Sequence, residues 1–458
     1  MGLATGCGVS TSSSEATEGQ TEEEALAEDE VKDATAGDVE AEVDKEVEET
    51  VQVTSSDGRT EVEFWYAGGK TAVGVIEEIV ADFNNSQEDY FVKTSTMADY
   101  DETYQKLQSG IAGNVAPDVA LLEVDAAKNL SDKDLLVDLS TFTGDDADFN
   151  RDDYQDVFFE QCRDGEKTFA FPAYGTTQVM YYNREVFEKA GVKAEDIKTW
   201  TQLAEVSKEI KEQGIATYGW EPMWNEDNLM DMAYSNGGKL LSDDGKTVLV
   251  NSDEWVEVWE SIRTWIHDDE IMTVHSGGQG WEYWYDTMDD AVDGTAGGYL
   301  GSSGDQADLD FTVVGAMEQP AWDDDSQSYP AARAKGMVAV GQSPEEEQKG
   351  AYEFIKFFTN PENQGKWSLA TGYVSVRKST VDTEEFKAYA EEHPEILVPI
   401  AQSGHASVRP IDPTGGEIYD ALGIAADKVE LEGISAKEAL DEACETAQKA
   451  LDKYYESK

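Results

Sequence analysis

Apolar and polar positions alternate between strand-like and helix-like periods from residue 61 onward. The run EVEFWY at 61–66 alternates as a strand and stops at two glycines, whereas the apolar residues between 75 and 83 recur at helical spacing. In order, the pattern predicts strands over 61–66, 89–97 and 116–124, with helices over 71–86 and 99–114 between them. Because strands that alternate with helices usually form a mainly parallel sheet covered on both faces, we expect an α/β fold.

The remainder of the chain is more helical. A strand, a turn at Pro172, a second strand and a helix are expected across 167–192. The pattern then predicts helices within 198–214, 220–238 and 252–268, short strands within 294–303, 310–317 and 334–340, and mostly helix in the last 110 residues. This return to short strands after a helical set indicates two lobes joined by several crossings.

Side chains at the ends of the predicted strands are candidates for ligand contact, because open α/β sheets bind ligands there. Tyr66 ends the first strand, and Glu123 and Asp125 end the third. The two carboxylates suit sugar hydroxyls, although an N-cap role for the next helix fits equally well. Tyr100 is a further candidate. Trp224 follows Pro222 in an aromatic segment that suits either a platform for a ligand or core packing.

The chain is strongly acidic, with 34 Lys+Arg against 97 Asp+Glu and a formal net charge of -63. This balance argues against nucleic acid and anionic lipid as partners, since both require cationic protein surface. Aromatic residues make up 10% of the chain, so the main body is expected to fold despite its acidity. No apolar run is long enough for a transmembrane helix.

Residues 1–60 have a different character from the rest. They are acidic and almost free of aromatics, and we expect a disordered acidic tether. Leu3-Ala4-Thr5-Gly6-Cys7 resembles a bacterial lipobox, in which the cysteine becomes lipidated. A lipid on Cys7 followed by a flexible tether would hold a soluble domain just outside a membrane.

The cysteines and histidines do not suggest a metal or redox site. Cys162 and Cys444 could form a disulfide or remain two buried thiols. The chain has four His, and no metal-ligand spacing stands among its three Cys. The acidic run at 145–153 has calcium-loop spacing but lacks the required glycine and the bidentate glutamate, so we expect a solvated turn. We expect no metal and no cofactor.

Several segments between 61 and 458 together resemble family 1 of the extracellular solute-binding proteins of ABC importers, most closely their sugar-binding and glycerol-3-phosphate-binding branches. The segments that carry the resemblance are FWYAGG, YDETYQKLQSGIAGNVAPDV, PAYGTTQVMYYNREVFEKAGV, KTWTQLAE, EFIKFFTNPENQGKWSLATGYVSVRKS and GISAKEALDEACETAQKAL. Their order and spacing make the resemblance specific.

The resemblance implies a two-lobe, periplasmic-binding-protein-like fold of class II type, with a hinge and a ligand cleft at the lobe interface. Residues 61–172 and about 296–345 would form an N-lobe, and residues 173–295 and about 346–458 a C-lobe. The implied function is that of a monomeric substrate-binding subunit. It would capture a sugar or oligosaccharide and deliver it to the importer's transmembrane subunits. The implied place is the outer face of a bacterial membrane, that of a Gram-positive cell.

The resemblance also implies cleft residues where motifs match. These are Thr176 before YYN, Trp200 of KTW as a stacking ring, the pair Ser302 and Ser303, Tyr373 of TGY, and Arg409 before the final helices. Trp200 also suits a hydrophobic staple at a helix start. Arg333 stands where relatives often carry glycine. Its guanidinium could fork onto a carboxylate, a phosphate or vicinal hydroxyls, or form a salt bridge at the rim.

Two alternatives stay open at the level of the sequence. The first is a substrate-binding subunit whose ligand is glycerol-3-phosphate or a glycerophosphodiester. An extracellular glycoside-active enzyme is the other, because the many carboxylates could supply a catalytic pair. No Gly-x-Ser-x-Gly elbow, P-loop or dinucleotide fingerprint stands at a strand–helix junction, so we expect a binding protein and not an enzyme.

Overall fold

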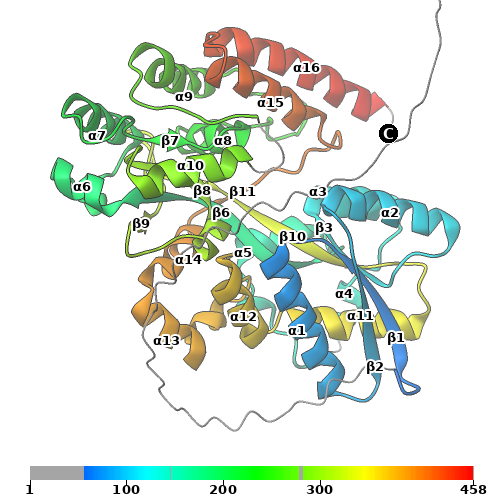
Figure 1. Ribbon diagram of the computed structural model, residues 1–458. Helices are drawn as coiled ribbons and strands as arrows, with labels where there is room; N and C mark the ends of the chain where they lie inside the picture. The colour runs from blue at the N-terminus through cyan, green and yellow to red at the C-terminus, as the bar shows by residue number, and fades with distance from the viewer. Residues whose placement is uncertain (1–55, 145, 278–281, 457–458) are drawn as a thin grey trace, which may run out of the picture. The chain divides into compact units, whose positions relative to one another are not determined.

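The computed structural model describes residues 56–144, 146–277 and 282–456, so Cys7 and nearly all of the expected tether lie outside the described residues. A nine-stranded sheet organises the described chain, with the strand order β2-β1-β3-β10-β6-β8-β7 and with β11 on β10 and β9 on β6 (Figure 1). Its strands are β1 Thr60–Tyr66, β2 Tyr90–Thr96, β3 Val119–Glu123, β6 Phe171–Asn183, β7 Glu221–Pro222, β8 Gly298–Ser302, β9 Val314–Met317, β10 Ala331–Ala339 and β11 Ser407–Val408; a separate hairpin pairs β4 Arg163–Asp164 with β5 Lys167–Thr168.

Sixteen α-helices surround the strands within the described residues. They are α1 Lys70–Ser86, α2 Tyr100–Gly113, α3 Val124–Ser131, α4 Ser140–Thr143, α5 Asp156–Phe159, α6 Arg184–Ala190, α7 Trp200–Glu212, α8 Glu226–Ser235, α9 Asp253–Arg263, α10 Glu282–Asp293, α11 Glu345–Phe358, α12 Pro361–Thr371, α13 Glu384–Glu392, α14 Val398–Ser403, α15 Glu417–Glu430 and α16 Ala436–Glu456. None of the described helices is long and apolar enough to cross a bilayer.

The predicted β-α-β-α-β start of the chain is confirmed. β1 pairs in parallel with both β2 and β3, and the predicted apolar stripe of α1 is buried. β10 then joins the other edge of β3 in the antiparallel direction. The periodicity was sufficient here because each element buries one regular face.

The predicted turn at Pro172 is wrong. β6 runs without interruption through Pro172, and its pairing with β10 slips where Gly336 faces Pro172 and Lys335 faces Tyr174. One residue of β6 is therefore left out of the ladder. A bulge of this kind tolerates a proline, which has no N–H to donate.

Two large hydrophobic cores lie along the sheet, with a small third cluster formed by Val179, Tyr181, Met223, Met288, Ala291 and Tyr299. The first is formed by residues between 62 and 174 and between 332 and 376, and the second by residues between 180 and 331 and between 418 and 451. β6 and β10 pass from one core to the other. β11 pairs with β10 at Ala331 and Ala332, where β10 makes this passage. These crossings are the segments that a hinge would use.

The division between the cores differs in part from the expected lobe limits. Residues 351–376, expected in the C-lobe, pack in the first core, whereas Leu300 and Trp322, expected in the N-lobe, pack in the second. As domain limits, the sequence-based boundaries stay a prediction. Cys162 and Cys444 are both free thiols, which decides against the disulfide.

Candidate functional site

A cavity of about 750 Å³ lies where the two cores meet beside the crossing strands. This volume is in the upper part of the range for small-molecule sites. The residues that line it come from both cores: Gly68 to Ala72, Tyr100, Glu123, Tyr174, Thr176 to Gln178, Met223 to Asn225, Asp227, Asn228, Asp231, Tyr283 to Tyr285, Met288, Ser302, Gly304, Asp305, Ala307, Asp308, Ala331, Arg333, Lys335, Thr371 and Tyr373.

Aromatic side chains form a wall on the side of the first core. The rings of Tyr174 and Tyr373 lie 4.9 Å apart, and the hydroxyl of Tyr100 contacts the hydroxyl of Tyr174. The ammonium of Lys335 lies 4.7 Å from the ring centre of Tyr100. Burial raises the pKa of Tyr373 to about 12, so its hydroxyl stays protonated and can donate a hydrogen bond.

A second aromatic wall belongs to the other lobe, where Tyr283 and Trp284 pack against the small third cluster. Trp224 meets Tyr283 edge to face at 4.9 Å, and Tyr283 meets Trp284 at 6.2 Å. Trp224 Nε1 donates to Asp427 Oδ1 at 2.8 Å, which fixes the indole plane. Faces of this kind stack on the apolar faces of sugar rings and other flat ligands.

Both cationic side chains of β10 at the cavity are already paired. Arg333 forms an ion pair with Asp227, and Lys335 forms one with Glu123. Burial alone would raise the pKa of Glu123, but the Lys335 ammonium holds it below its usual value. Burial and the neighbouring Arg409 lower the pKa of Arg333.

Small hydroxyls and buried acids complete the polar lining. Thr176 Oγ1 lies 3.2 Å from Ser302 Oγ and 3.3 Å from Ser303 Oγ. Asp305 accepts hydrogen bonds from Trp284 and Tyr299, and burial raises its pKa to about 8. At neutral pH this carboxyl is therefore largely protonated and can also donate.

The exit of α12 places Tyr373 at the cavity, where the family resemblance implied a ligand contact. Asn360 caps the helix by accepting from Asn363 N at 2.8 Å. Gly372 ends it with φ of 74°, in the left-handed region that favours glycine. A Cβ on Gly304 would lie 2.8 Å from the Tyr373 ring, so the ring needs a glycine on the opposing segment.

The structure brings most of the predicted site residues together. Seven of them line the cavity: Tyr100, Glu123, Thr176, Trp224, Ser302, Arg333 and Tyr373. Ser303 is fully buried, with its hydroxyl in contact with Thr176. Arg409 and Asp125 stand behind the charge pairs, with Arg409 3.5 Å from Asp125 and 3.8 Å from Asp227.

Tyr66 and Trp200 lie in the cores instead of at the cavity. Tyr66 is fully buried in the same alternating row as Val62 and Phe64, and its hydroxyl donates to Glu77. Trp200 is fully buried in the second core at the start of α7, in one stripe with Leu203. The periodicity that identified each element also identifies these positions as buried ones. The burial of Trp200 favours the packing role at the helix start over the stacking role.

Sequence reasoning missed several lining residues. Lys335 could have been found, because it follows Arg333 by two positions and so shares its face of β10. Asp227 and Tyr283 carry no comparable signal. They reach the cavity because α8 packs beside β10, and α10 beside β6 and β8.

The amino end of α1 also faces the cavity. Gly68, Gly69 and the first turn of the helix line it, no side chain caps the helix, and no acidic residue stands in its first turn. Lys70 makes no ion pair within the described part of the chain. Unpaired backbone N–H groups at such an end favour an anion.

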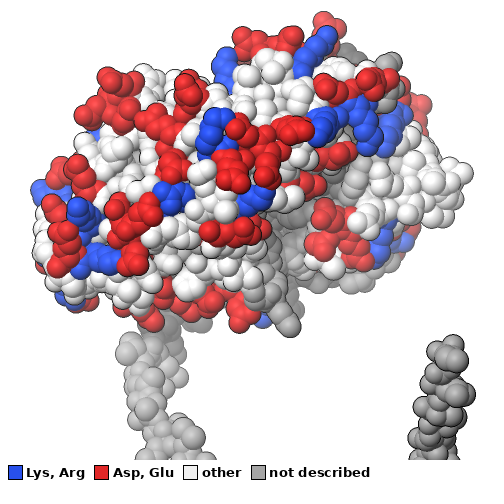
Figure 2. All heavy atoms as spheres, turned by 90° about the horizontal axis from the view of Figure 1, so that it is seen from above, with Lys and Arg blue, Asp and Glu red and all other residues white. Residues whose placement is uncertain are grey.

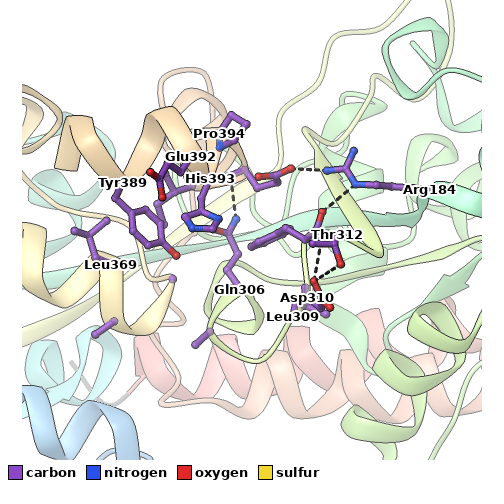
Figure 3. A pocket seen from close by; sticks show the side chains of 16 residues that line it. Arg184, Gln306, Leu309, Asp310, Thr312, Leu369, Tyr389, Glu392, His393 and Pro394 are labelled. Carbon is purple, nitrogen blue, oxygen red and sulfur yellow. Dashed lines mark hydrogen bonds and ion pairs between the residues drawn. The ribbon is translucent and has the colours of Figure 1, made fainter. Parts of the chain in front are cut away.

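A second cavity of about 550 Å³ lies apart from the aromatic walls (Figure 3). Tyr389 and His393 stand on one side of it and Arg184 on the other. The Arg184 guanidinium pairs with Glu395 at 2.5 Å and donates to the carbonyls of Phe311 and Val314. Tyr389 and His393 pack against each other at 4.5 Å, whereas the guanidinium of Arg184 is already paired with protein groups.

Comparisons with known proteins agree with this geometry. A family model described as bacterial extracellular solute-binding protein matches residues 78–394. The sn-glycerol-3-phosphate-binding periplasmic protein UgpB of Agrobacterium fabrum is 24% identical over 365 residues, which cover 75% of this chain and 80% of that protein. UgpB of Escherichia coli K12 is 22% identical over 349 residues, covering 73% and 78%.

Solved structures are similar over most of the chain. UgpB from Mycobacterium tuberculosis in complex with glycerophosphocholine has a TM-score of 0.75 at 21% identity, covering 87% of this chain and all of that one. The cyclic alpha-maltosyl-1,6-maltose binding protein from Arthrobacter globiformis has a TM-score of 0.73 at 21% identity, covering 86% and 100%. These likenesses confirm the predicted two-lobe α/β fold.

Proposed function

The chain belongs to the bacterial extracellular solute-binding proteins, which bind small molecules and deliver them to the permeases of ABC importers, and we propose that its ligand is a sugar or oligosaccharide. The cavity between the two cores is the proposed binding site. Closure of the lobes about β6 and β10 would bury the ligand, and the importer would recognise the closed form.

The observation that carries this proposal is the pair of aromatic walls on opposite lobes. Tyr100, Tyr174 and Tyr373 come from the first, and Trp224 and Tyr283 from the second. Flat apolar faces combined with convergent hydroxyl, carboxyl and guanidinium groups are what a ring of alternating C–H and O–H groups requires. The volume of about 750 Å³ leaves room for more than one sugar ring.

Glycerol-3-phosphate or a glycerophosphodiester is the second candidate. The amino end of α1 and Lys70 favour it, and the UgpB relatives carry that ligand in their names. The pairing of Arg333 with Asp227 and of Lys335 with Glu123 argues against it. An anion would have to compete with two carboxylates for these cations, in a chain of net charge -63.

Thermal unfolding in the presence of neutral sugars, maltooligosaccharides, sn-glycerol-3-phosphate and glycerophosphocholine tests the proposal. A bound ligand raises Tm in a saturable way that follows its dissociation constant. We expect the largest shift with a neutral sugar and the same shift in Lys70→Gln. A shift with the phosphate compounds alone, lost in Lys70→Gln, would support the second candidate instead.

We also propose that the protein is a monomeric lipoprotein, held by Cys7 at the outer face of a Gram-positive membrane. The small residues before Cys7 and the acidic stretch after it support this anchor. Expression of the full-length protein as wild type and as Cys7→Ala tests the anchor. Wild type should sediment with membranes, whereas the variant should not; equal sedimentation would contradict it.

The protein is proposed to bind its ligand without chemical turnover. The matching family and the relatives are binding proteins, which supports this view. The ligand-bound protein can be incubated with its sugar and the products separated by chromatography. We expect to recover the sugar unchanged. Cleavage of the sugar by the protein would support the glycoside-active enzyme instead.

A further inference from the structure

Three side chains of types that can bind a metal ion meet in the second lobe. Glu221 stands in β7, His275 in the segment that follows Met272, and Asp290 in α10. Backbone contacts bring the three segments together. Trp220 forms a β-bridge with Met272, and Tyr218 forms one with Ala296, whose N–H donates to Asp290 O at 3.0 Å. They are far apart in sequence, so their spacing gave no sign of a shared site.

The distances within this cluster suit one metal ion. His275 Nε2 lies 3.0 Å from Asp290 Oδ2 and 3.8 Å from Glu221 Oε2, and all three ligand atoms lie within 4.8 Å of one another. Tetrahedral zinc with bonds of about 2.1 Å holds its ligand atoms roughly 3.4 Å apart. Small side-chain movements would therefore bring the three atoms into contact with one ion.

Glu221 has a long contact with His275 but accepts no hydrogen bond in the described part of the chain. Its side chain is fully buried, and neither carboxylate oxygen has a hydrogen-bond donor among the described residues. A buried, unpartnered carboxylate beside a second acid is unfavourable unless a proton or a cation is shared between them.

Solvent can reach the cluster from one side. The side chains of His275 and Asp290 are 34% and 27% exposed, whereas Glu221 closes the site from within. An ion could enter past the histidine without unfolding of the lobe.

We propose that Glu221, His275 and Asp290 bind one divalent transition-metal ion, with zinc the best fit. One imidazole and two carboxylates suit zinc, whereas calcium and magnesium prefer oxygen ligands alone. The ion would join β7, the segment after Met272 and α10. Trp224 follows β7 by two residues and Tyr283 lies in α10, so the ion would stabilise the aromatic wall of the second lobe. This site is independent of which ligand the cavity binds.

Zinc titration of the full-length protein tests the site. The protein is first stripped with a chelator and then held in excess Mg²⁺, which occupies the non-specific acidic surface. Zinc content after dialysis and the Tm are measured for wild type and His275→Ala. We expect wild type to retain one more equivalent of zinc than the variant and to gain several degrees in Tm that the variant does not gain.

His405→Ala is the matched control, because His405 also pairs with a carboxylate, Glu318, at 2.6 Å but on the exposed surface. It should retain zinc as wild type does. Asp290→Asn provides a second variant that should lose the ion. Equal zinc content in wild type and His275→Ala would overturn the proposal. Glu221 and Asp290 would then share a proton instead of a metal ion.

Discussion

At the scale of single residues, the face of a strand on which a side chain lies decides whether it enters the core or the cavity. Val62, Phe64 and Tyr66 share one buried row of β1, whereas Arg333 and Lys335 share the cavity-facing row of β10. Residue type alone did not distinguish these cases, since tyrosine and tryptophan serve equally in cores and at ligands. The row to which a side chain belongs was the stronger signal.

Tyr373→Phe tests one cavity hydroxyl. The ring should stay in place, because its contacts with Tyr174 and Trp367 do not involve the oxygen. We expect the sugar affinity to fall by about three- to tenfold, the effect of one lost hydrogen bond, and Tm without ligand to change little. Calorimetric titration measures the first and thermal unfolding the second. Unaltered affinity would leave Tyr373 with a packing role only.

At the scale of elements, the sequence predicted the periodic pieces and missed what tertiary packing decides. The five opening elements follow from regular buried faces, and the α11–α12 break follows from Pro361 and the Asn360 cap. The strand through Pro172 could not be predicted, because the bulge that admits the proline depends on β10. The contribution of α8 and α10 to the cavity likewise depends on how distant segments pack.

Gly372→Ala tests the turn that ends α12. Gly372 has φ of 74°, and a Cβ there would lie 2.6 Å from Ser303 O. We expect a loss of more than about 2 kcal/mol in the free energy of unfolding, from backbone strain and the clash together. Gly191→Ala is the matched control, because it has φ of 70° and no atom within 4 Å of its Cβ. It should lose about 1 kcal/mol. Equal losses in denaturant unfolding would show that the close approach to Ser303 costs nothing.

At the scale of the whole molecule, acidity shapes stability. Figure 2 shows Asp and Glu spread over the visible face with Lys and Arg among them, in a chain of net charge -63. Self-repulsion of this size destabilises the folded state at neutral pH and is screened by salt. Added salt and mild acid should therefore both stabilise the fold.

Asp305→Asn tests the buried acids in this balance. The carboxyl of Asp305 ionises near pH 4 in the unfolded chain, but burial keeps it protonated to about pH 8 in the fold. The folded state thus binds more protons in this window, and the free energy of unfolding falls as pH rises through it. The variant should reduce that slope by up to about 1.4 kcal/mol per pH unit.

Denaturant unfolding between pH 5 and 8 measures the slope. Asp310→Asn is the control, because hydrogen bonds from Thr312 lower the pKa of the exposed Asp310 and move its titration below this window. Its slope should equal that of wild type. An unchanged slope in Asp305→Asn would show that Asp305 is ionised in the fold.

The central claim is that the aromatic-walled cavity binds a neutral sugar. Its most direct test is calorimetric titration of wild type, Trp224→Ala and Trp65→Ala with the sugar that raises Tm most. Trp65 is the control, because it is only partly buried and lies outside the cavity. We predict one site per chain, wild-type affinity in Trp65→Ala and at least about tenfold weaker binding in Trp224→Ala. Equal affinities in all three proteins, or no heat with any neutral sugar while sn-glycerol-3-phosphate binds, would contradict the claim.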